Sequence, residues 1–260
     1  MKNTPKKKET SWNTVTTWYD TLLETDTDTY QAKVLTPNIT RLMQIKKGDR
    51  VLDVACGQGY FSRLLHEQGA KVVGVDIGKD LIAQAKLRSD SNITYYITPS
   101  HILTPIKTNT IDKAVIVLAI QNIEKVLETI SEIKRVLTKE GSCYIVLNHP
   151  AFRIPQASDW VYDDEKKLQS RKIDGYMNER TIKIDMTPGE KNLKKKLYTV
   201  SFHRPLQWYM KIFSKYGFAI TRLEEWISHK ESGNGPRKIA EDAARKEFPM
   251  FLCVELQSKL

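Results

Sequence analysis

The amino-acid sequence predicts an α/β protein built on a doubly wound, mostly parallel sheet. Short apolar runs typical of buried strands alternate along the chain with segments whose apolar residues recur at helical spacing. Parallel strands are joined through crossover helices that cover both faces of their sheet, so this alternation indicates the class. With 260 residues, the chain is long enough to bury one substantial core without disulfides or a structural metal.

The predicted strands are apolar runs bounded by turn residues. In chain order they cover 49–55, 71–76, 93–98, 112–119, 142–148 and 251–256. The last of them is expected to close the sheet.

Helices are predicted where apolar residues fall on one face. Two lie between Trp12 and Gln44, and another follows the first glycine turn and stops at Gly69. The remaining helices cover 79–88, 123–137, 205–216 and 237–247. The segment FAITRLEEW and the loop SGNGP separate the last two.

Two regions depart from the alternation. Residues 1–11 are rich in Lys and have no apolar face, which predicts a disordered basic arm ahead of a domain that covers 12–260. Residues 149–204 are predicted to be an insertion after the fifth strand. The insertion carries 12 Lys and Arg against 8 Asp and Glu, too small an excess to define a nucleic-acid-binding patch.

Composition excludes several classes of protein. Cys56, Cys143 and Cys253 form no CxxC pair, so neither a disulfide framework nor a metal site is expected. No segment has the apolar length of a signal peptide core or a membrane span, which favours a cytoplasmic protein without membrane insertion. The net charge of +10 would attract polyanions, but its diffuse distribution favours an ordinary Lys-rich surface.

The glycine turn after the first strand is the most informative segment. Gly57 and Gly59, with Asp76 after the second strand, loosely match a dinucleotide-binding fingerprint. However, Ser62 replaces the third glycine, and Asp53 would place a carboxylate where a pyrophosphate should lie. The same carboxylate favours a ligand with a sulfonium and an ammonium group, which indicates S-adenosylmethionine. An ordinary strand-to-helix turn, with Asp53 as a turn carboxylate, is the alternative.

These segments resemble a known family. DVACGQG with GVDIGKDLIAQAK resembles motif I and the following acidic loop of class I S-adenosylmethionine-dependent methyltransferases. IDKAVIVLA, the helix to Leu137 and TKEGSCYIVLN resemble the later motifs, so the likeness covers about residues 40–148. The sub-group it resembles most includes the ubiquinone and menaquinone biosynthesis methyltransferases.

The resemblance implies a seven-stranded, Rossmann-like sheet with the cofactor at the glycine turn. It places Gly57 and Gly59 beneath the methionine and ribose, Asp76 on the ribose hydroxyls and Ile77 on one face of the adenine. Ser100 stands where relatives often have an acid for the adenine amino group, and Leu118 lies near the methyl donor. The predicted cofactor-binding residues are Asp53, Ala55, Gly57, Gly59, Asp76, Ile77, Ser100, Leu118 and Tyr19. Trp18 and Tyr19 resemble an N-terminal element that folds over the cofactor, although plain packing would also explain them.

Catalytic side chains are harder to identify, because methyl transfer needs mainly alignment and exclusion of water. His149, after the fifth strand, and His203, at the end of the insertion, are the candidate general bases. Turn or cap histidines are the alternative for each.

The acceptor is predicted to be a small molecule, with the insertion on the acceptor side. Its aromatic residues are numerous enough to roof a pocket, although they would equally form a small satellite core. They are Phe152, Trp160, Tyr162, Tyr176, Tyr198 and Phe202. RNA is the alternative acceptor because of the basic balance, and a non-catalytic S-adenosylmethionine-binding module is the third hypothesis. The sequence gives no indication of oligomeric state.

Overall fold

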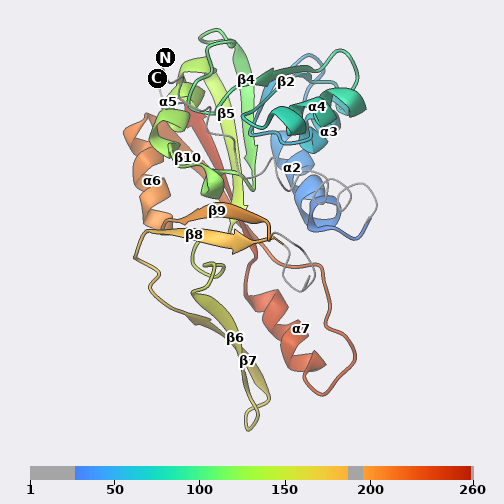
Figure 1. Ribbon diagram of the computed structural model, residues 1–260, viewed down its shortest axis with the longest axis vertical. Coiled ribbons are helices and arrows are strands. Elements are labelled where there is room, and N and C mark those ends of the chain that lie inside the picture. The colour runs from blue at the N-terminus through green and yellow to red at the C-terminus, as the bar shows by residue number, and fades with distance from the viewer. Residues whose placement is uncertain (1–26, 187–195, 259–260) are drawn as a thin grey trace, which may run out of the picture.

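A seven-stranded sheet forms the centre of the computed structural model, which describes residues 27–186 and 196–258 (Figure 1). The strand order is β3-β2-β1-β4-β5-β11-β10. The strands are β1 (Arg50–Val54), β2 (Lys71–Asp76), β3 (Thr94–Ile97), β4 (Ile111–Val117), β5 (Leu137–Asn148), β10 (Phe218–Trp226) and β11 (Phe251–Ser258). The predicted α/β class and mostly parallel sheet are confirmed.

Helices cover both faces of this sheet. Neighbouring residues of β1 show why: Val51 packs into the cluster formed with α2, α3 and α4, whereas Leu52 packs into the cluster formed with α5 and α6. Successive side chains of a strand point to opposite faces, so both faces need apolar residues and both are buried. The helical segments are η2 (Gln31–Leu35), α2 (Thr36–Met43), α3 (Tyr60–Glu67), α4 (Lys79–Arg88), η3 (Ile120–Asn122), α5 (Val126–Val136), α6 (Leu206–Lys215) and α7 (Lys238–Glu247).

The prediction that the last strand closes the sheet is wrong. β11 lies between β5 and β10 and is antiparallel to both, so β10 forms the edge. β5 is also longer than predicted, because Leu137 already pairs with Ile111 directly after α5. A register shift between Ile111 and Lys113 absorbs the extra residues before regular pairing resumes at Ser142.

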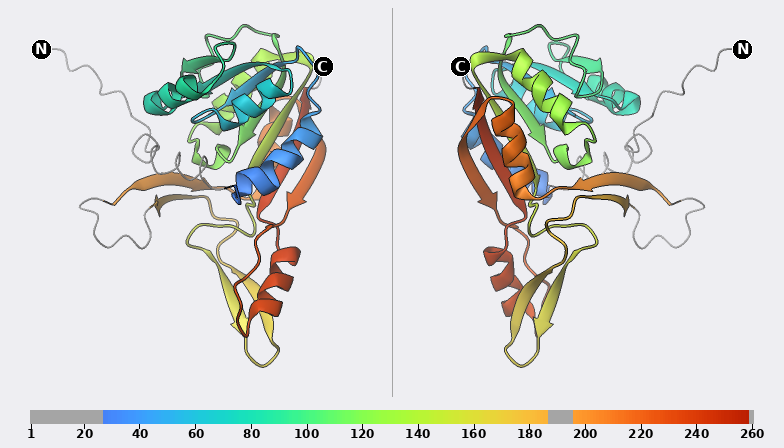
Figure 2. Two further views of the ribbon diagram at one scale, coloured as in Figure 1. Left: turned by 90° about the vertical axis from the view of Figure 1, so that its right-hand side faces the viewer. Right: turned by 90° about the vertical axis from the view of Figure 1, so that its left-hand side faces the viewer.

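The region predicted as an insertion contains two antiparallel hairpins. β6 (Ser158–Asp163) pairs with β7 (Leu168–Ile173), and β8 (Arg180–Asp185) pairs with β9 (Tyr198–His203). Because β5 delivers the chain to the carboxyl edge of the parallel strands, both hairpins lie beyond that edge. In Figure 2 the β6–β7 hairpin and α7 extend side by side away from the sheet.

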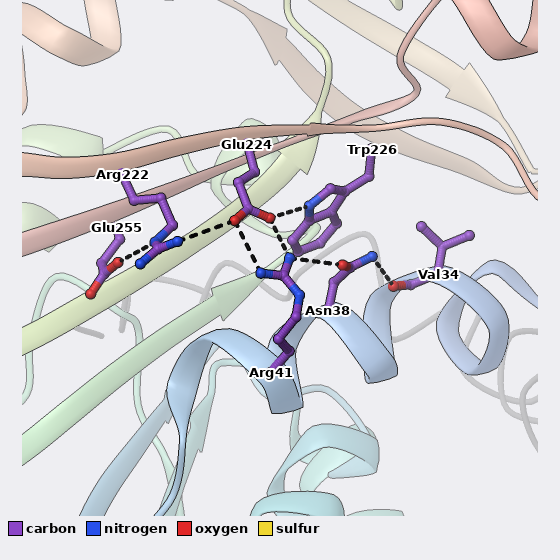
Figure 3. A network of polar contacts seen from close by, with 7 residues as sticks. All are labelled: Val34, Asn38, Arg41, Arg222, Glu224, Trp226 and Glu255. Atoms are coloured by element: carbon purple, nitrogen blue, oxygen red, sulfur yellow. Dashed lines mark hydrogen bonds and ion pairs between the residues drawn. The ribbon is translucent and has the colours of Figure 1, made fainter.

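The first described helices are tied to the far edge of the sheet by a polar network (Figure 3). Arg41 of α2 pairs with Glu224 of β10, which also accepts a hydrogen bond of 3.1 Å from the Trp226 indole. Arg222 bridges Glu224 and Glu255, the latter on β11. The predicted arm at 1–11 and most of the first predicted helix lie outside the described residues.

Within the described ranges, no helix is both long and apolar enough to cross a lipid bilayer.

Candidate functional site

The turn between β1 and α3 is held in left-handed backbone. Ala55 (φ 57°), Gly57 (φ 56°) and Gly59 (φ 81°) all have positive φ values. Glycine adopts this region at little cost, but a residue such as Ala55 persists there only where the surrounding structure enforces it. At Gly59 space is also limiting, since an added Cβ would lie 2.5 Å from the Tyr95 hydroxyl.

Two buried carboxylates flank this turn. Asp53 on β1 is 2% exposed and accepts a hydrogen bond of 2.6 Å from the Ser62 hydroxyl. Asp76, at the end of β2, accepts hydrogen bonds from the backbone N–H groups of Gly57 (3.0 Å) and Gly78 (2.7 Å). Ser62, which stands in place of the third glycine, therefore orients Asp53, and Asp76 fixes the turn.

The two carboxylates make the site acidic. Burial raises the pKa of Asp53 to about 7, against the Ser62 hydrogen bond, and the nearby charge of Asp76 raises it further. Burial also raises the pKa of Asp76, opposed by the backbone N–H groups that it accepts. Among the described residues, no Lys or Arg forms an ion pair with either carboxylate. Desolvated carboxylates without a cation favour a positively charged ligand.

A cavity of about 160 Å³ opens over the turn, where β1 lies between β2 and β4. This is the point at which strand order reverses, and ligands of open α/β sheets bind there at the carboxyl ends of the strands. Six of the nine predicted cofactor-binding residues line it. They are Asp53, Ala55, Gly57, Asp76, Ile77 and Leu118.

The other three predicted residues lie elsewhere. Gly59 is the N-cap of α3 and does not line the cavity. The Ser100 hydroxyl shares a hydrogen bond of 2.9 Å with the Thr129 hydroxyl, and Ser100 does not line the cavity. Tyr19, with Trp18, is outside the described residues.

Sequence reasoning missed several residues that line the cavity. Gln31 reaches it from η2, a π-helical turn that apolar periodicity does not reveal. Tyr60 and Phe61 come from the first turn of α3, and Asn122 comes from η3. Their position beside the predicted glycine turn is the signal that would have found Tyr60 and Phe61.

A second cavity of about 440 Å³ adjoins the first. Gln31, Leu118 and Asn122 border both cavities. The other walls of the second cavity come from η3, from the end of β5 and the segment after it, and from the four strands β6, β7, β8 and β9 with the residue that follows β8. Leu118, between the two cavities, has a positive φ of 52°. Strained backbone of this kind clusters where ligands bind.

His149 is engaged by the protein on both ring nitrogens. Its Nδ1 accepts hydrogen bonds from the backbone N–H groups of Ala151 (3.2 Å) and Phe152 (3.3 Å). Because a backbone N–H only donates, the ring proton lies on Nε2, which donates to Glu225 at 2.7 Å. Burial lowers the pKa of His149 in spite of Glu225, and His149 lines neither cavity.

One ring nitrogen of His203 is hydrogen-bonded within the protein. Its Nε2 donates to the Tyr176 carbonyl at 2.8 Å, which makes Nδ1 the acceptor nitrogen. Burial lowers the pKa of His203, so the ring is neutral near pH 7. His203 lines a small cavity of about 30 Å³ that shares Gln121, Asn148 and Arg153 with the second cavity.

The aromatic residues of the insertion line neither of the two main cavities. Phe152 and Trp160 pack on Phe248, with ring centroids 5.6 and 5.5 Å apart, and Tyr176 lies 6.1 Å from the His203 ring. Among the described residues these side chains therefore form satellite contacts rather than a roof over the site. No group of three potential metal ligands occurs in the described part of the chain.

Comparison with known proteins identifies a methyltransferase domain within the chain. A family model described as a methyltransferase domain matches residues 52–145, the span from β1 into β5. Residues 52–145 therefore form a methyltransferase domain of the class I, S-adenosylmethionine-dependent type. A model of protein-L-isoaspartate(D-aspartate) O-methyltransferase also matches residues 1–95. The resemblance predicted from the sequence motifs is thus confirmed.

Two solved methyltransferase structures share the fold. One S-adenosylmethionine-dependent methyltransferase, from Mesorhizobium loti, has a TM-score of 0.64 at 24% identity and covers 85% of this chain and 96% of its own. A putative one from Listeria monocytogenes has the same TM-score at 21% identity, over 87% of this chain and 100% of its own.

Curated methyltransferase relatives match over shorter spans. A demethylmenaquinone methyltransferase from Symbiobacterium thermophilum is 36% identical over 127 residues, 45% of this chain and 50% of the relative. A ubiquinone biosynthesis O-methyltransferase from Coxiella burnetii is 44% identical over 61 residues, 22% of this chain and 26% of the relative. A 23S rRNA (uracil(1939)-C(5))-methyltransferase from Shewanella amazonensis is 41% identical over 58 residues, 21% of this chain and 13% of the relative. The chain therefore spans half or less of the length of these relatives.

The residues of the first cavity fit the methyltransferase cofactor. The two oxygens of Asp76 accept the backbone N–H groups of Gly57 and Gly78, and a carboxylate offers about four acceptor positions, so acceptor capacity remains for a ribose hydroxyl. Ile77 is 43% exposed at the cavity, an apolar surface suited to an adenine ring. The buried carboxylate of Asp53 lines the same cavity, and a carboxylate there suits a sulfonium or ammonium group.

Proposed function

We propose that this chain transfers a methyl group from S-adenosylmethionine to a small-molecule acceptor. The observation that carries the proposal is the junction of an acidic cavity at the strand-order reversal with a second cavity of about 440 Å³. The bound cofactor supplies an electrophilic methyl group. The chain then has to orient both ligands along one line and exclude water between them.

Individual residues have separate tasks in this proposal. Asp76 binds the ribose, Asp53 attracts the cationic part of the cofactor, and Leu118 forms the boundary across which the methyl group passes. His203 is the proposed general base, since its Nδ1 carries a lone pair at neutral pH. His149 is proposed to be structural, because both of its nitrogens are already hydrogen-bonded within the protein.

The relatives favour a small molecule over RNA. Two of them are named as a demethylmenaquinone methyltransferase and a ubiquinone biosynthesis O-methyltransferase, and the first aligns over 127 residues, 45% of this chain. The relative named for 23S rRNA aligns with this chain over only 58 residues, 13% of its own length.

Calorimetry with the full chain tests the cofactor assignment. S-Adenosylhomocysteine should bind with one site per chain, whereas NADH should give no heat because its pyrophosphate would face Asp53 and Asp76. Tight NADH binding without any response to S-adenosylhomocysteine would refute the proposal.

Methyl-labelled S-adenosylmethionine tests the acceptor class. After incubation with separate small-metabolite, RNA and protein fractions of a cell extract, label should enter the small-metabolite fraction. Label in RNA, accompanied by steeply salt-dependent binding of total tRNA, would establish the RNA alternative instead. Cofactor binding without any labelled product would favour the non-catalytic module.

A further inference from the structure

The two adjoining cavities carry opposite charge. The first is lined by two carboxylates and no cation, whereas the second is lined by Arg153 and Arg171 and by no Asp or Glu of the described residues. This separation of charge would let the first cavity bind a cationic cofactor while the second cavity excludes a second cation. We propose that the methyl acceptor is an organic carboxylate, and that Arg153 and Arg171 bind its carboxylate group. This inference rests on the proposed methyltransferase function and specifies the substrate class of the same site.

Arg153 is a partly buried cation without a carboxylate partner among the described residues. Its backbone N–H binds the His149 carbonyl at 2.9 Å, which places the residue in the turn directly after β5. Its guanidinium lies 5.9 Å from the centroid of the Phe251 ring. Burial lowers the pKa of Arg153, and the charge of Arg171 lowers it further while Tyr30 opposes the change. A desolvated cation next to another cation is unfavourable, and an anion between the two would offset both effects.

Arg171 is held in a fixed orientation toward the same cavity. Its Nε donates to the Phe152 carbonyl at 2.9 Å and one terminal nitrogen donates to the Ser158 hydroxyl at 2.7 Å. Its guanidinium also lies 4.8 Å from the centroid of the Trp160 ring. Burial lowers the pKa of Arg171, and the charge of Asp159 partly offsets this shift. The Asp159 carboxylate accepts the Trp160 backbone N–H and forms no ion pair with Arg171 among the described residues. Two of the five guanidinium N–H groups are therefore used, and the remaining ones suit a carboxylate.

The rest of the lining is polar without being acidic. Amide and hydroxyl side chains surround the arginines, and Ile154, Ile184 and Met186 supply apolar surface. Gln121 donates from its amide nitrogen to the Leu118 carbonyl at 2.8 Å, but its buried amide oxygen has no hydrogen-bond partner. An unpaired buried acceptor favours a ligand with a hydroxyl or amine hydrogen to donate. The cavity thus fits a carboxylate that also carries such a group.

Arg245 offers a matched control for the position of the anion. Arg153 and Arg171 also border a separate cavity of about 170 Å³ on the α7 side, and Arg245 lines that cavity but not the one next to the cofactor. Arg245 donates to the Ser232 hydroxyl at 3.2 Å. Loss of Arg245 should therefore leave carboxylate binding intact if the anion occupies the cavity beside the cofactor.

Ligand-observed NMR tests the inference on the full chain saturated with S-adenosylhomocysteine. The probes are two pairs, benzoate with benzamide and hexanoate with hexanamide. The two members of a pair have nearly the same shape, but only the carboxylate is charged. At least one carboxylate should bind about tenfold or more tightly than its amide. Arg153→Gln should abolish that preference. Arg171→Lys should reduce it, because an ammonium group lacks the paired N–H donors of a guanidinium. Arg245→Gln should retain it.

The two proposals fail in different ways. If the wild-type chain does not bind S-adenosylhomocysteine, the methyltransferase proposal fails. If it binds S-adenosylhomocysteine but no probe carboxylate is preferred over its amide, or the preference survives in Arg153→Gln, the carboxylate inference is overturned. Undiminished S-adenosylhomocysteine binding by Arg153→Gln shows that the variant is folded, so a lost preference then reflects the missing guanidinium. A preference removed by Arg245→Gln would move the anion to the α7 side and also overturn the inference.

Discussion

The ionisation of Asp53 depends on what occupies the cavity beside it. Burial raises the pKa of Asp53 to about 7, so this carboxyl binds a proton near neutral pH when the cavity holds no cation. A cationic ligand stabilises the ionised form and lowers that pKa again. Cofactor binding and proton release are therefore linked at this one side chain.

S-Adenosylmethionine binding at pH 7 should release a fraction of a proton from Asp53, and affinity should rise as the pH increases from 6 to 8. Calorimetry in phosphate and in Tris checks the release, because the two buffers differ in ionisation enthalpy. Asp53→Asn should bind about tenfold more weakly and release no proton through this site. Asp90→Asn, at an exposed turn, should behave like the wild type. Equal heats in both buffers for the wild-type chain would contradict the linkage.

The sequence predicted the residues of the cofactor cavity better than those of the acceptor side. Asp53, Gly57 and Asp76 sit at strand ends, and a parallel sheet brings such ends together whatever the details of packing. The environment of His149 depends on Glu225, which is 76 positions away on β10, and no local pattern reveals that contact. Arg153 and Arg171 were missed for the same reason, because only the folded insertion brings them to one cavity.

The strand, turn and helix of residues 50–67 work as one element. Gly59 begins α3 in left-handed backbone and packs directly on Tyr95 of β3. Tyr95 is 5% exposed, and its hydroxyl is hydrogen-bonded to Ser89 at 2.8 Å, so the ring has little freedom to move. The glycine is therefore required both by its φ and by its neighbour.

Gly59→Ala should lower the free energy of unfolding by about 1–3 kcal/mol, from left-handed backbone and from overpacking against Tyr95. Urea denaturation measures the change. Gly233→Ala is the matched control, since no atom lies within 4 Å of the added methyl group. Similar stabilities for the two variants would show that the turn rearranges around the methyl group.

Periodicity predicted the elements of the sheet and not those beyond it. Strands such as β2 and β4 are buried on both faces, so their apolar runs are plain in the sequence. The β6 and β7 strands are largely exposed, and neither SDWVYD nor LQSRKI alternates regularly between apolar and polar residues. The position of β11 inside the sheet depends on pairing with β5 and β10, which a strand's own sequence does not specify.

Across the whole molecule, segments from both ends of the described chain meet at one edge of the sheet. Arg41 of α2 lies 183 positions from Glu224 of β10, and Asn38 supports Arg41 with a hydrogen bond of 3.0 Å (Figure 3). Since η2 immediately precedes α2 and carries Gln31 to both cavities, this edge contact helps to fix one wall of the site.

Glu224→Gln should therefore destabilise the protein modestly, by about 1 kcal/mol, because the pair with Arg41 is partly exposed and screened. The hydrogen bond from Arg41 lowers the pKa of Glu224 below its usual 4.5. A lowered pKa in the folded state gives stability that is present above pH 4.5 and is lost as the pH falls through the folded value. In urea denaturation, the free energy of unfolding should be higher for the wild type than for Glu224→Gln at pH 7, and this difference should shrink toward pH 4 and in high salt. The exposed Glu140→Gln should show no such difference, and a difference that is constant with pH would mean that packing, rather than charge, joins α2 to β10.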